Sequence, residues 1–370
     1  MNPSRLFDKR NTTSKMDEIK YSLLAQENIP KLLRSISIIN HETEAHDQRG
    51  ADESMWRWQY ESLPTKKSLV YVASYREEII GYYHIPVYGI RVGQEIYKIG
   101  NIQSVAVLSK FRNQKIFQKL ATFANSDADK HVDLIYTFPN QKSIHTFTKY
   151  NNFQLVSELP IYVLPLDTSK LIESMVNLLG LQYLIGLLLD MVFGVMAKKL
   201  GTKEKLFLMD DITTEVERLF NHFSMKHHLG LIRNKEFLRW RYRNSPKGKY
   251  HFVGLESDGN LSAVAILKEE NILSSKGLVL MDTAFKDIEQ LQKLLTNLNK
   301  KFFEERGTFI FVSGLFSGIE KLKMCGFLRV PRIFVPRKLN LLARWTKNTK
   351  SEKIFDCSSW LVTLGDWDVF

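Results

Sequence analysis

The stretch of the chain best suited to do chemistry runs from Val105 to Ala124 and reads VAVLSKFRNQKIFQKLATFA. It leads from an apolar, strand-like run through a basic loop into the first turn of a helix-like run. Backbone N–H groups in the first turn of a helix have no partner inside the helix, so with the helix dipole they can bind an anion such as a pyrophosphate. Arg112 and Lys115 would add positive charge. A solvated basic turn explains the same residues equally well on chemical grounds, so both interpretations stay open at this point.

The elements that must position this loop recur along the chain. Two segments carry a tryptophan, a tyrosine and a proline at identical spacing, and each leads into a pair of strand-like runs. The two sets, 182 positions apart, are Trp58, Tyr60 and Pro64, and Trp240, Tyr242 and Pro246. A second echo closes each segment, with Phe153, Val156 and the run 161–163 matched by Phe327, Val330 and the run 333–335. Duplication of one unit explains both echoes.

Within each segment, helix-like and strand-like periods alternate in the order strand, helices, three strands, helix, strand, helix and two strands. This order favours an α/β or α+β layer fold with a central mixed sheet flanked by helices. Apolar residues spaced by three and four predict helices over 116–130 and 285–306. The predicted division of the chain is a flexible tail at 1–15, a first domain at 16–167, an apolar helical insert at 168–204 and a second domain at 205–370.

The insert contains an apolar run at 174–197, which is interrupted by one charge at Asp190 and by three glycines. Its length would permit a membrane span. An acidic residue near the middle of a span costs about 2.5 to 3.5 kcal/mol, and a single span would separate two units that are expected to pack together. Three interpretations stay open: a buried helical hairpin, a helix lying on the membrane surface, and a true span.

Composition excludes several classes of protein. The chain has 370 residues, of which 44% are apolar, and this is enough material for two domains. The two cysteines, Cys325 and Cys357, give neither a disulfide framework nor a Cys-rich zinc spacing, which favours a reducing, cytoplasmic compartment. The paired His227 and His228 lack the frame of a metal site, so we expect no metal and interpret the pair as a helix end. The polar N-terminal tail does not resemble a secretory signal.

The formal charge of +12 favours anionic partners such as the phosphates of CoA, acidic lipid headgroups or nucleic acid. The basic residues are scattered along the chain instead of forming a stripe with interleaved aromatic residues. We therefore expect no nucleic-acid partner. The sequence gives no indication of the oligomeric state.

The run from Arg112 to Phe117 resembles the acetyl-CoA motif of GNAT N-acetyltransferases, which reads Arg or Gln, two residues, Gly, one residue, then Gly or Ala. Arg112, Lys115 and Phe117 occupy those positions, and Asn113 and Lys115 stand where the family usually has glycines. Those glycines normally let the backbone approach the pyrophosphate closely. The resemblance implies that this loop binds acetyl-CoA through Arg112, Asn113, Gln114, Lys115, Ile116 and Phe117.

Further stretches are similar to a branch of tandem GNAT proteins that is often found in bacterial surface-polysaccharide loci. They are the strand-like run 135–138 followed by Pro139, Asn140 and Ser143, then Phe147, Asn152 and Phe153 ahead of 159–167, the run 231–242, and the ending 361–370. The resemblance implies two tandem GNAT-like domains. The second domain would be a degenerate copy, because Asp282 and Asp287 flank its helix start where the first domain has a basic loop.

GNAT enzymes move an acetyl group directly from acetyl-CoA to an amine. In that family, a splay between two central strands exposes backbone amides to the pantetheine and to the thioester carbonyl. The resemblance places this role on the amides of Val105, Ala106 and Val107. Asn140 and Ser143, at the start of the next helix, would also reach the cofactor, and a helix cap is the local alternative for Asn140.

The proton donor for the departing thiolate is commonly a tyrosine in the helix after the second strand, where this sequence has Phe147 and Thr148. Three groups could serve instead, namely Tyr150, His145 and the chain-terminal carboxylate of Phe370, since the C-terminus enters the site in a related acetyltransferase branch. Catalysis by positioning, with water as the proton carrier, is a further alternative.

The sequence and the resemblance together predict an acetyl-CoA-dependent N-acetyltransferase that acts on a small-molecule or glycan amine, such as an amino sugar of a surface polysaccharide. The alternative is a catalytically degenerate tandem GNAT protein that acts as a binding or scaffold module. We expect a cytoplasmic protein. Peripheral contact with the inner face of the membrane through 174–197 is an added hypothesis.

Overall fold

The computed structural model describes most of the chain. The described residues are 18–42, 52–141, 143–165, 203–272, 275–298, 309–335, 338–346 and 352–367. The predicted tail at 1–15, the apolar run at 174–197 and the terminal Phe370 lie outside them. In the described part of the chain, no helix is long and apolar enough to cross a membrane.

The first half of the chain alternates strands and helices as predicted. Its strands and α-helices in the described chain are β1 (Lys20–Leu23), α2 (Ile29–Glu42), α3 (Glu53–Tyr60), β2 (Ser68–Tyr75), β3 (Glu78–Val92), β4 (Glu95–Val107), α4 (Ile116–Ala128), β5 (Leu134–Thr137), α5 (Ile144–Tyr150), β6 (Gln154–Glu158) and β7 (Ile161–Pro165). The helix predicted over 116–130 is confirmed as α4. Its three–four spacing gives one buried face, made by Ile116, Leu120, Ala121, Ala124, Asn125 and Ala128.

The second half follows nearly the same order. Its strands are β8 (Glu204–Met209), β9 (Leu229–Leu231), β10 (Tyr250–Ser257), β11 (Asn260–Ile272), β12 (Ser275–Phe285), β13 (Phe309–Leu315), β14 (Leu328–Arg329), β15 (Asn340–Trp345) and β16 (Trp360–Thr363). Its helices and helical turns include α8 (Thr214–Ser224), α9 (Lys235–Leu238), η4 (Arg239–Arg243), α10 (Ile288–Thr296), η5 (Ile319–Cys325), η6 (Arg332–Phe334) and η9 (Leu364–Asp366).

One predicted echo differs from the structure. The run 333–335 falls in the helical turn η6 and not in a strand, and the strand that corresponds to β7 begins only at Asn340. Pro331 and Pro336 flank this run, and proline cannot donate a hydrogen bond to a strand neighbour. The chain therefore turns once more before it re-enters the sheet.

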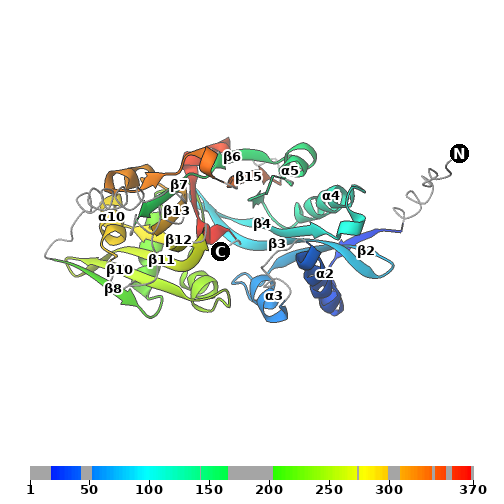
Figure 1. The fold of residues 1–370 in the computed structure, drawn as a ribbon, viewed down its shortest axis with the longest axis horizontal. Coiled ribbons are helices and arrows are strands. Elements are labelled where there is room, and N and C mark those ends of the chain that lie inside the picture. Colours follow the sequence, from blue (N-terminus) through cyan, green and yellow to red (C-terminus); the bar gives the residue numbers. More distant parts are fainter. Residues whose placement is uncertain are drawn as a thin grey trace, which may run out of the picture.

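A single mixed sheet passes through both halves, and the predicted α/β layer fold is confirmed (Figure 1). The halves exchange one strand each. β15, from the second half, lies between β5 and β6 of the first, whereas β7, from the first half, pairs with β13 and β14 of the second. Figure 1 also shows α4 on one face of the first half's strands and α2 and α3 on the other.

The recurring tryptophans meet where the halves join. The indole Nε1 of Trp58 donates to the backbone carbonyl of Trp240 at 3.1 Å, and the Nε1 of Trp240 donates to the carbonyl of Trp58 at 3.0 Å. Their rings stack with centroids 5.2 Å apart. Both side chains belong to a hydrophobic core that continues from one half into the other. The spacing noticed in the sequence thus corresponds to one reciprocal contact.

Candidate active site

The parallel pairing of β4 with β5 ends near the middle of the sheet, at the last residue of β5. Their parallel pairing runs from Ile99 opposite Leu134 to Ile102 opposite Thr137, where the Thr137 hydroxyl donates to the Ile102 carbonyl at 3.1 Å. Beyond that point β4 continues to Val107 beside β3, and in the described chain it has no further pairing with β5. Beyond Ile102, the edge of β4 that faces β5 therefore has no strand partner in the described chain. We call this unpaired edge, next to the end of β5, the opening, and it is the arrangement that the predicted splay requires.

Hydrogen-bond alternation decides which amides face this opening. The amide of Leu108 donates to the Ile80 carbonyl of β3 at 2.9 Å. Because antiparallel pairs alternate, the amide of Ala106 also turns toward β3, whereas those of Val105 and Val107 turn toward the opening. Two of the three predicted amides are therefore placed to meet a ligand between the strands.

A β-bulge at Ser104 sets this direction, and it was not predicted from the sequence. Ser104 has a φ of 38°, and the pairing of β3 with β4 shifts register beside it. Buried His84 fixes the bulge with both ring nitrogens: Nε2 lies 3.0 Å from the indole nitrogen of Trp56, and Nδ1 lies 3.0 Å from the Ser104 carbonyl. Since indole can only donate, His84 carries its proton on Nδ1 and donates it to Ser104. A lone histidine in a strand gives no such signal in a sequence.

The loop between β4 and α4 has the backbone shape that glycines would give it. Asn113 has a φ of 63° and Lys115 a φ of 59°, both in the left-handed region. This conformation costs a residue with a Cβ roughly 1–2 kcal/mol, less for asparagine. Lys115, at a glycine position of the motif, and Asn113, where the family also usually has glycine, are therefore the two left-handed residues of the loop, whereas Phe117 lies inside α4.

Side chains fix the rest of the loop. The Arg112 Nε donates to the Val107 carbonyl at 3.1 Å, while the guanidinium stays partly exposed. Glu42, at the end of α2, accepts from the amide of Ser109 at 2.9 Å and from its hydroxyl at 2.7 Å. The hydroxyl contact is the main reason that the pKa of Glu42 lies below its ordinary value, with Arg112 nearby contributing to the same effect.

The start of α4 differs from that of most other helices. Its N-cap is Lys115, whose side chain makes no cap hydrogen bond. The first turns of α3, α8, α9 and α10 each receive a side-chain cap, from Asp52, Thr213, Asn234 and Asp287 respectively. An uncapped helix start leaves first-turn amides available to an anion.

The remaining predicted cofactor residues lie close to this loop or on the next helix. Ile116 is buried, and Phe117 is half-buried with its ring centroid 6.4 Å from that of Phe147. The Gln114 amide donates to a backbone carbonyl within the loop, that of Lys110, at 3.3 Å. The Asn140 Oδ1 accepts from the amide of Ser143 at 3.0 Å and from its hydroxyl at 3.1 Å. Asn140 thus bonds within the turn that precedes α5, whose N-cap residue, Ser143, makes no side-chain cap hydrogen bond.

Two of the three predicted proton-transfer residues lie on α5, and the third lies outside the described residues. His145 and Tyr150 are exposed on α5, with ring centroids 5.8 Å apart. Phe370 lies outside the described residues. The last described residue, Trp367, packs its ring 5.8 Å from that of Phe138, the residue that follows β5 at the opening. The end of the described chain thus lies beside the opening.

Residues 363–367, here called the C-terminal strap, are held by the second half of the molecule. The buried Arg241 donates through Nε to the Gly365 carbonyl at 3.0 Å and through Nη2 to the Trp367 carbonyl at 2.7 Å. Buried Arg233 joins Asp282 at 2.8 Å to Asp366 at 2.7 Å. The two sequence stretches 231–242 and 361–370 that carried the resemblance therefore meet, and the first anchors the second.

Burial dominates the electrostatics of this anchor. It raises the pKa of the Asp366 carboxyl, although the neighbouring Arg233 acts in the opposite direction. Asp282, predicted as a residue that repels a pyrophosphate, instead accepts from Arg233 and from the Tyr242 hydroxyl, the latter at 2.9 Å. The Asp282 carboxylate therefore accepts hydrogen bonds from buried side chains of the second half.

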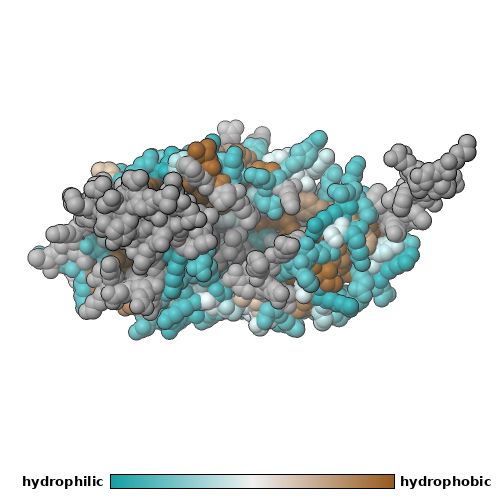
Figure 2. All heavy atoms as spheres, viewed as in Figure 1, coloured by the Kyte–Doolittle hydropathy of each residue, from teal (hydrophilic) through white to brown (hydrophobic). Residues whose placement is uncertain are grey.

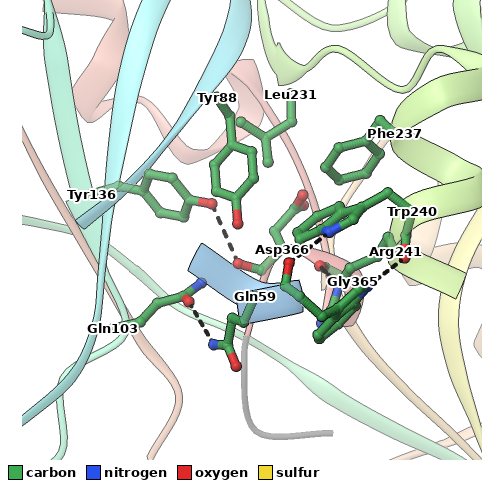
Figure 3. A pocket seen from close by; sticks show the side chains of 11 residues that line it. Gln59, Tyr88, Gln103, Tyr136, Leu231, Phe237, Trp240, Arg241, Gly365 and Asp366 are labelled. Atoms are coloured by element: carbon green, nitrogen blue, oxygen red, sulfur yellow. Dashed lines mark hydrogen bonds between the residues drawn. The ribbon is translucent and has the colours of Figure 1, made fainter. Parts of the chain in front are cut away.

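A small cavity lies between the halves, on the side of the sheet that carries α3 (Figure 3). One wall is Gln103, in the part of β4 beyond its pairing with β5, and its Oε1 accepts from the Gln59 side chain at 3.1 Å. Tyr136 donates to the Asp366 carbonyl at 3.3 Å on another wall. The lining residues are Trp58, Gln59, Tyr88, Gln103, Tyr136, Leu231, Phe237, Trp240, Arg241, Gly365 and Asp366.

Of the two adjacent histidines, His227 has a structural role. His227 follows α8, as the predicted helix end requires, and its Nε2 accepts from the Ser317 amide at 2.8 Å. Burial lowers the pKa of His227 to about 4, so the ring is neutral at pH 7. Among the described residues, no group of three or more histidine, cysteine, aspartate and glutamate side chains could hold a metal ion.

The sequence matches no protein-family model and no curated protein. The fold is similar to that of several solved structures. A GCN5-related N-acetyltransferase from Anabaena variabilis has a TM-score of 0.62 at 12% identity, with 89% of this chain and 73% of that chain covered. Another from Kribbella flavida has a TM-score of 0.55 at 7% identity, covering 89% and 71%. Eis1 from Mycobacterium abscessus has a TM-score of 0.54 at 9% identity, covering 89% and 74%. The chain therefore has the fold of GCN5-related N-acetyltransferases over most of its length.

Proposed function

We propose that the protein is an acetyl-CoA-dependent N-acetyltransferase whose cofactor site lies in the first half. One observation carries the proposal: the opening between β4 and β5 adjoins a helix start that no side chain caps. The fold shared with N-acetyltransferases supports it. A second cofactor site is not proposed, because the corresponding helix α10 is capped by the carboxylate of Asp287.

In this proposal the loop holds the cofactor through its backbone. The first-turn amides of α4 bind the pyrophosphate, and the exposed Arg112 guanidinium adds a charged contact. The amides of Val105 and Val107 bind the pantetheine and polarise the thioester carbonyl. These donors are fixed before the cofactor arrives, so little reorganisation is needed when negative charge develops on the oxygen.

The acetyl transfer itself forms a C–N bond and breaks the C–S bond. The attacking nitrogen must lose a proton, and the departing thiolate must gain one. Tyr150, His145 and the Phe370 carboxylate stay the proposed groups for these proton transfers. We replace each group in turn, with Tyr150→Phe, His145→Gln and an added residue after Phe370, which converts its carboxylate into a peptide bond. The pH profile of turnover then assigns the role to whichever change removes a limb of the profile.

The acceptor is proposed to be an amine on a small molecule or a glycan, such as an amino sugar of a surface polysaccharide. α4 covers one face of the first half's strands, so the acceptor is proposed to approach from the opposite face, where Gln103 of β4 lines the small cavity. A cytoplasmic location, with contact to the inner face of the membrane through 174–197, completes the proposal.

The test compares matched charge reversals in the two halves. Arg112→Glu lies in the β4–α4 loop, and Lys286→Glu lies in the corresponding β12–α10 turn. We expect acetyl-CoA to raise the melting temperature of the wild type and of Lys286→Glu, but not of Arg112→Glu. Thiol release from acetyl-CoA in the presence of a panel of amines then measures turnover.

The absence of a thermal shift with the wild type at saturating acetyl-CoA would sink the proposal. Equal loss in both variants would also count against it, since the charge effect would then not belong to the β4–α4 loop. A thermal shift without turnover of any amine would instead favour the binding or scaffold module.

A further inference from the structure

The segment from η5 to η6, residues 319–334, exposes large hydrophobic side chains. Ile333 is 85% exposed, Met324 69% and Leu328 51%. They lie within ten residues of one another in the chain. Scattered single hydrophobic side chains are normal on a protein surface, but several together in one short segment call for a physical explanation.

The local fold prevents these side chains from turning inward. η5 ends at Gly326, whose φ of 85° reverses the chain, and the neighbouring Leu322 and Phe327 are buried. β14 then pairs with β7 through only two residues, Leu328 opposite Val163 and Arg329 opposite Tyr162. Leu322 and Phe327 anchor the segment in the core, and Met324, Leu328 and Ile333 remain on its outer side.

Positive charge surrounds the same segment. Lys321, Lys323 and Arg329 are exposed and form no ion pair with a described residue. Arg332 and Lys338 are shared by a single acidic partner, Glu158, at 3.2 and 4.0 Å. The segment therefore combines protruding aliphatic groups with an excess of cationic side chains.

The corresponding part of the first half lacks this combination. Its strand β6 exposes one large hydrophobic side chain, Leu155, at 55%. On α5, Tyr150 is 41% exposed and Lys149 is the one lysine or arginine, whereas Glu158 of β6 pairs with Arg332 and Lys338 of the second half. The first half's segment thus carries fewer exposed aliphatic groups and fewer basic side chains than the η5–η6 segment.

We propose that the η5–η6 segment docks on an anionic lipid bilayer. Ile333, Met324 and Leu328 enter the headgroup region, and Lys321, Lys323 and Arg329 bind the anionic headgroups. Figure 2 shows hydrophobic atoms at the upper edge of the molecule, where an orange part of the ribbon lies in Figure 1, and others over the first half.

The chemistry favours a bilayer over a macromolecular partner. Lysine is depleted in the cores of protein interfaces, so two lysines interleaved with the hydrophobic groups argue against a protein partner. Nucleic acid would use the cations but gains little from three aliphatic side chains. A bilayer with anionic lipids uses both, because apolar burial and electrostatic attraction add at its surface. The proposal does not depend on acetyl transfer.

The experiment is flotation of the full-length protein with lipid vesicles. One vesicle is phosphatidylcholine alone and the other an equimolar mixture with phosphatidylglycerol. We expect the wild type to float with the mixed vesicle only. Ile333→Asp should reduce binding about tenfold, and Arg329→Gln roughly fivefold, the effect of one positive charge near the surface.

The matched control compares leucines of similar exposure in the two halves. Leu328→Asp should weaken flotation, whereas Leu155→Asp should float as the wild type does. Thermal unfolding of each variant confirms that these exposed substitutions leave the fold intact.

Three results would overturn the proposal. The first is a wild type that floats with neither vesicle or equally with both. The second is flotation that Ile333→Asp and Leu328→Asp leave unchanged, which would move membrane contact to another segment such as 174–197. The third is binding to duplex DNA that Arg329→Gln weakens and Ile333→Asp does not, without flotation of the wild type.

Discussion

The β4–α4 connection and the β12–α10 connection occupy the same place in the order of elements but differ in length and chemistry. Eight residues, Leu108 to Lys115, lie between β4 and α4, and only Lys286 and Asp287 lie between β12 and α10. The short connection ends in a carboxylate that accepts from the Gln290 amide at 3.1 Å. The long one ends in a left-handed lysine with no side-chain cap.

This difference shows how the same order of elements can give one helix start that is capped for stability and another that is left uncapped. An aspartate cap satisfies an amide of its own helix and places a negative charge where a pyrophosphate would bind. In the second half, the helix start thus serves stability, and the side chains of η4 serve to hold the C-terminal strap. In the first half the helix start stays open to an anion.

The largest expected effect tests whether the second half supports the site through the strap. In Gly365→Ala the new Cβ would lie 1.9 Å from the Tyr242 hydroxyl oxygen and 3.1 Å from the Met281 carbonyl oxygen. We expect the free energy of unfolding to fall by about 3 kcal/mol, because the buried site cannot expand. Denaturant unfolding measures the change.

Gly259→Ala is the control for that substitution. No atom lies within 4 Å of a Cβ placed at Gly259, and only its φ of 74° is unfavourable. The expected loss is about 1 kcal/mol. Similar losses in the two variants would show that the strap tolerates displacement and that the second half is not needed to hold it.

The next prediction exchanges the helix caps between the halves. Lys115→Asp removes a positive charge and adds a negative one at the start of α4. We expect acetyl-CoA affinity to fall by about 10- to 100-fold in calorimetric titration. The reciprocal Asp287→Lys should leave that affinity unchanged and lower the free energy of unfolding by about 1 kcal/mol, since α10 loses its cap. Unchanged acetyl-CoA affinity in Lys115→Asp would contradict the proposed difference between the β4–α4 and β12–α10 connections.

A smaller effect is expected at the contact that both halves share equally. Trp58→Phe and Trp240→Phe each remove an indole donor and leave the other residue's carbonyl without that bond. Each should cost about 1–2 kcal/mol of unfolding free energy. The double variant should lose less than the sum, because the residues contact one another. Strongly unequal single losses would contradict the reciprocal description.

The smallest effect concerns backbone conformation in the β4–α4 loop. Lys115→Gly relieves the left-handed strain of roughly 1–2 kcal/mol but increases the freedom of the unfolded chain. We expect a net gain of about 0.5 kcal/mol, measured as a higher melting temperature. Lys119→Gly, inside α4, should instead lose about 1 kcal/mol. Destabilisation by Lys115→Gly would mean that the lysine side chain contributes more than its backbone costs.

Local patterns in the sequence predicted the elements well. The apolar spacing of α4 is a local signal, and the helix appears in the structure. The helix predicted from 285 begins later, as α10 at Ile288, because Phe285 belongs to β12. The loop's position before α4 followed from the same reasoning. The left-handed conformation of Lys115 could not be predicted in this way, because a lysine normally adopts a negative φ.

Contacts between distant residues could not be predicted in the same way. The exchange of β7 and β15 depends on which edge each strand reaches, and neither strand's composition specifies a partner. Likewise, the pairing of Arg241 with the Gly365 and Trp367 carbonyls joins a side chain to backbone atoms, which carry no sequence signature. Resemblance marked both stretches as important but did not reveal that they touch.

The exchanged strands also bear on how the protein is made. β15 fills the place between β5 and β6 of the first half, yet in the chain it follows every described strand except β16. A ribosome must therefore translate most of the second half before the first half can close its sheet, and until then β5 and β6 each present an unpaired edge. Neither half can be expressed alone with its sheet complete, so a gene divided between 165 and 203 would yield two fragments that must find each other to fold.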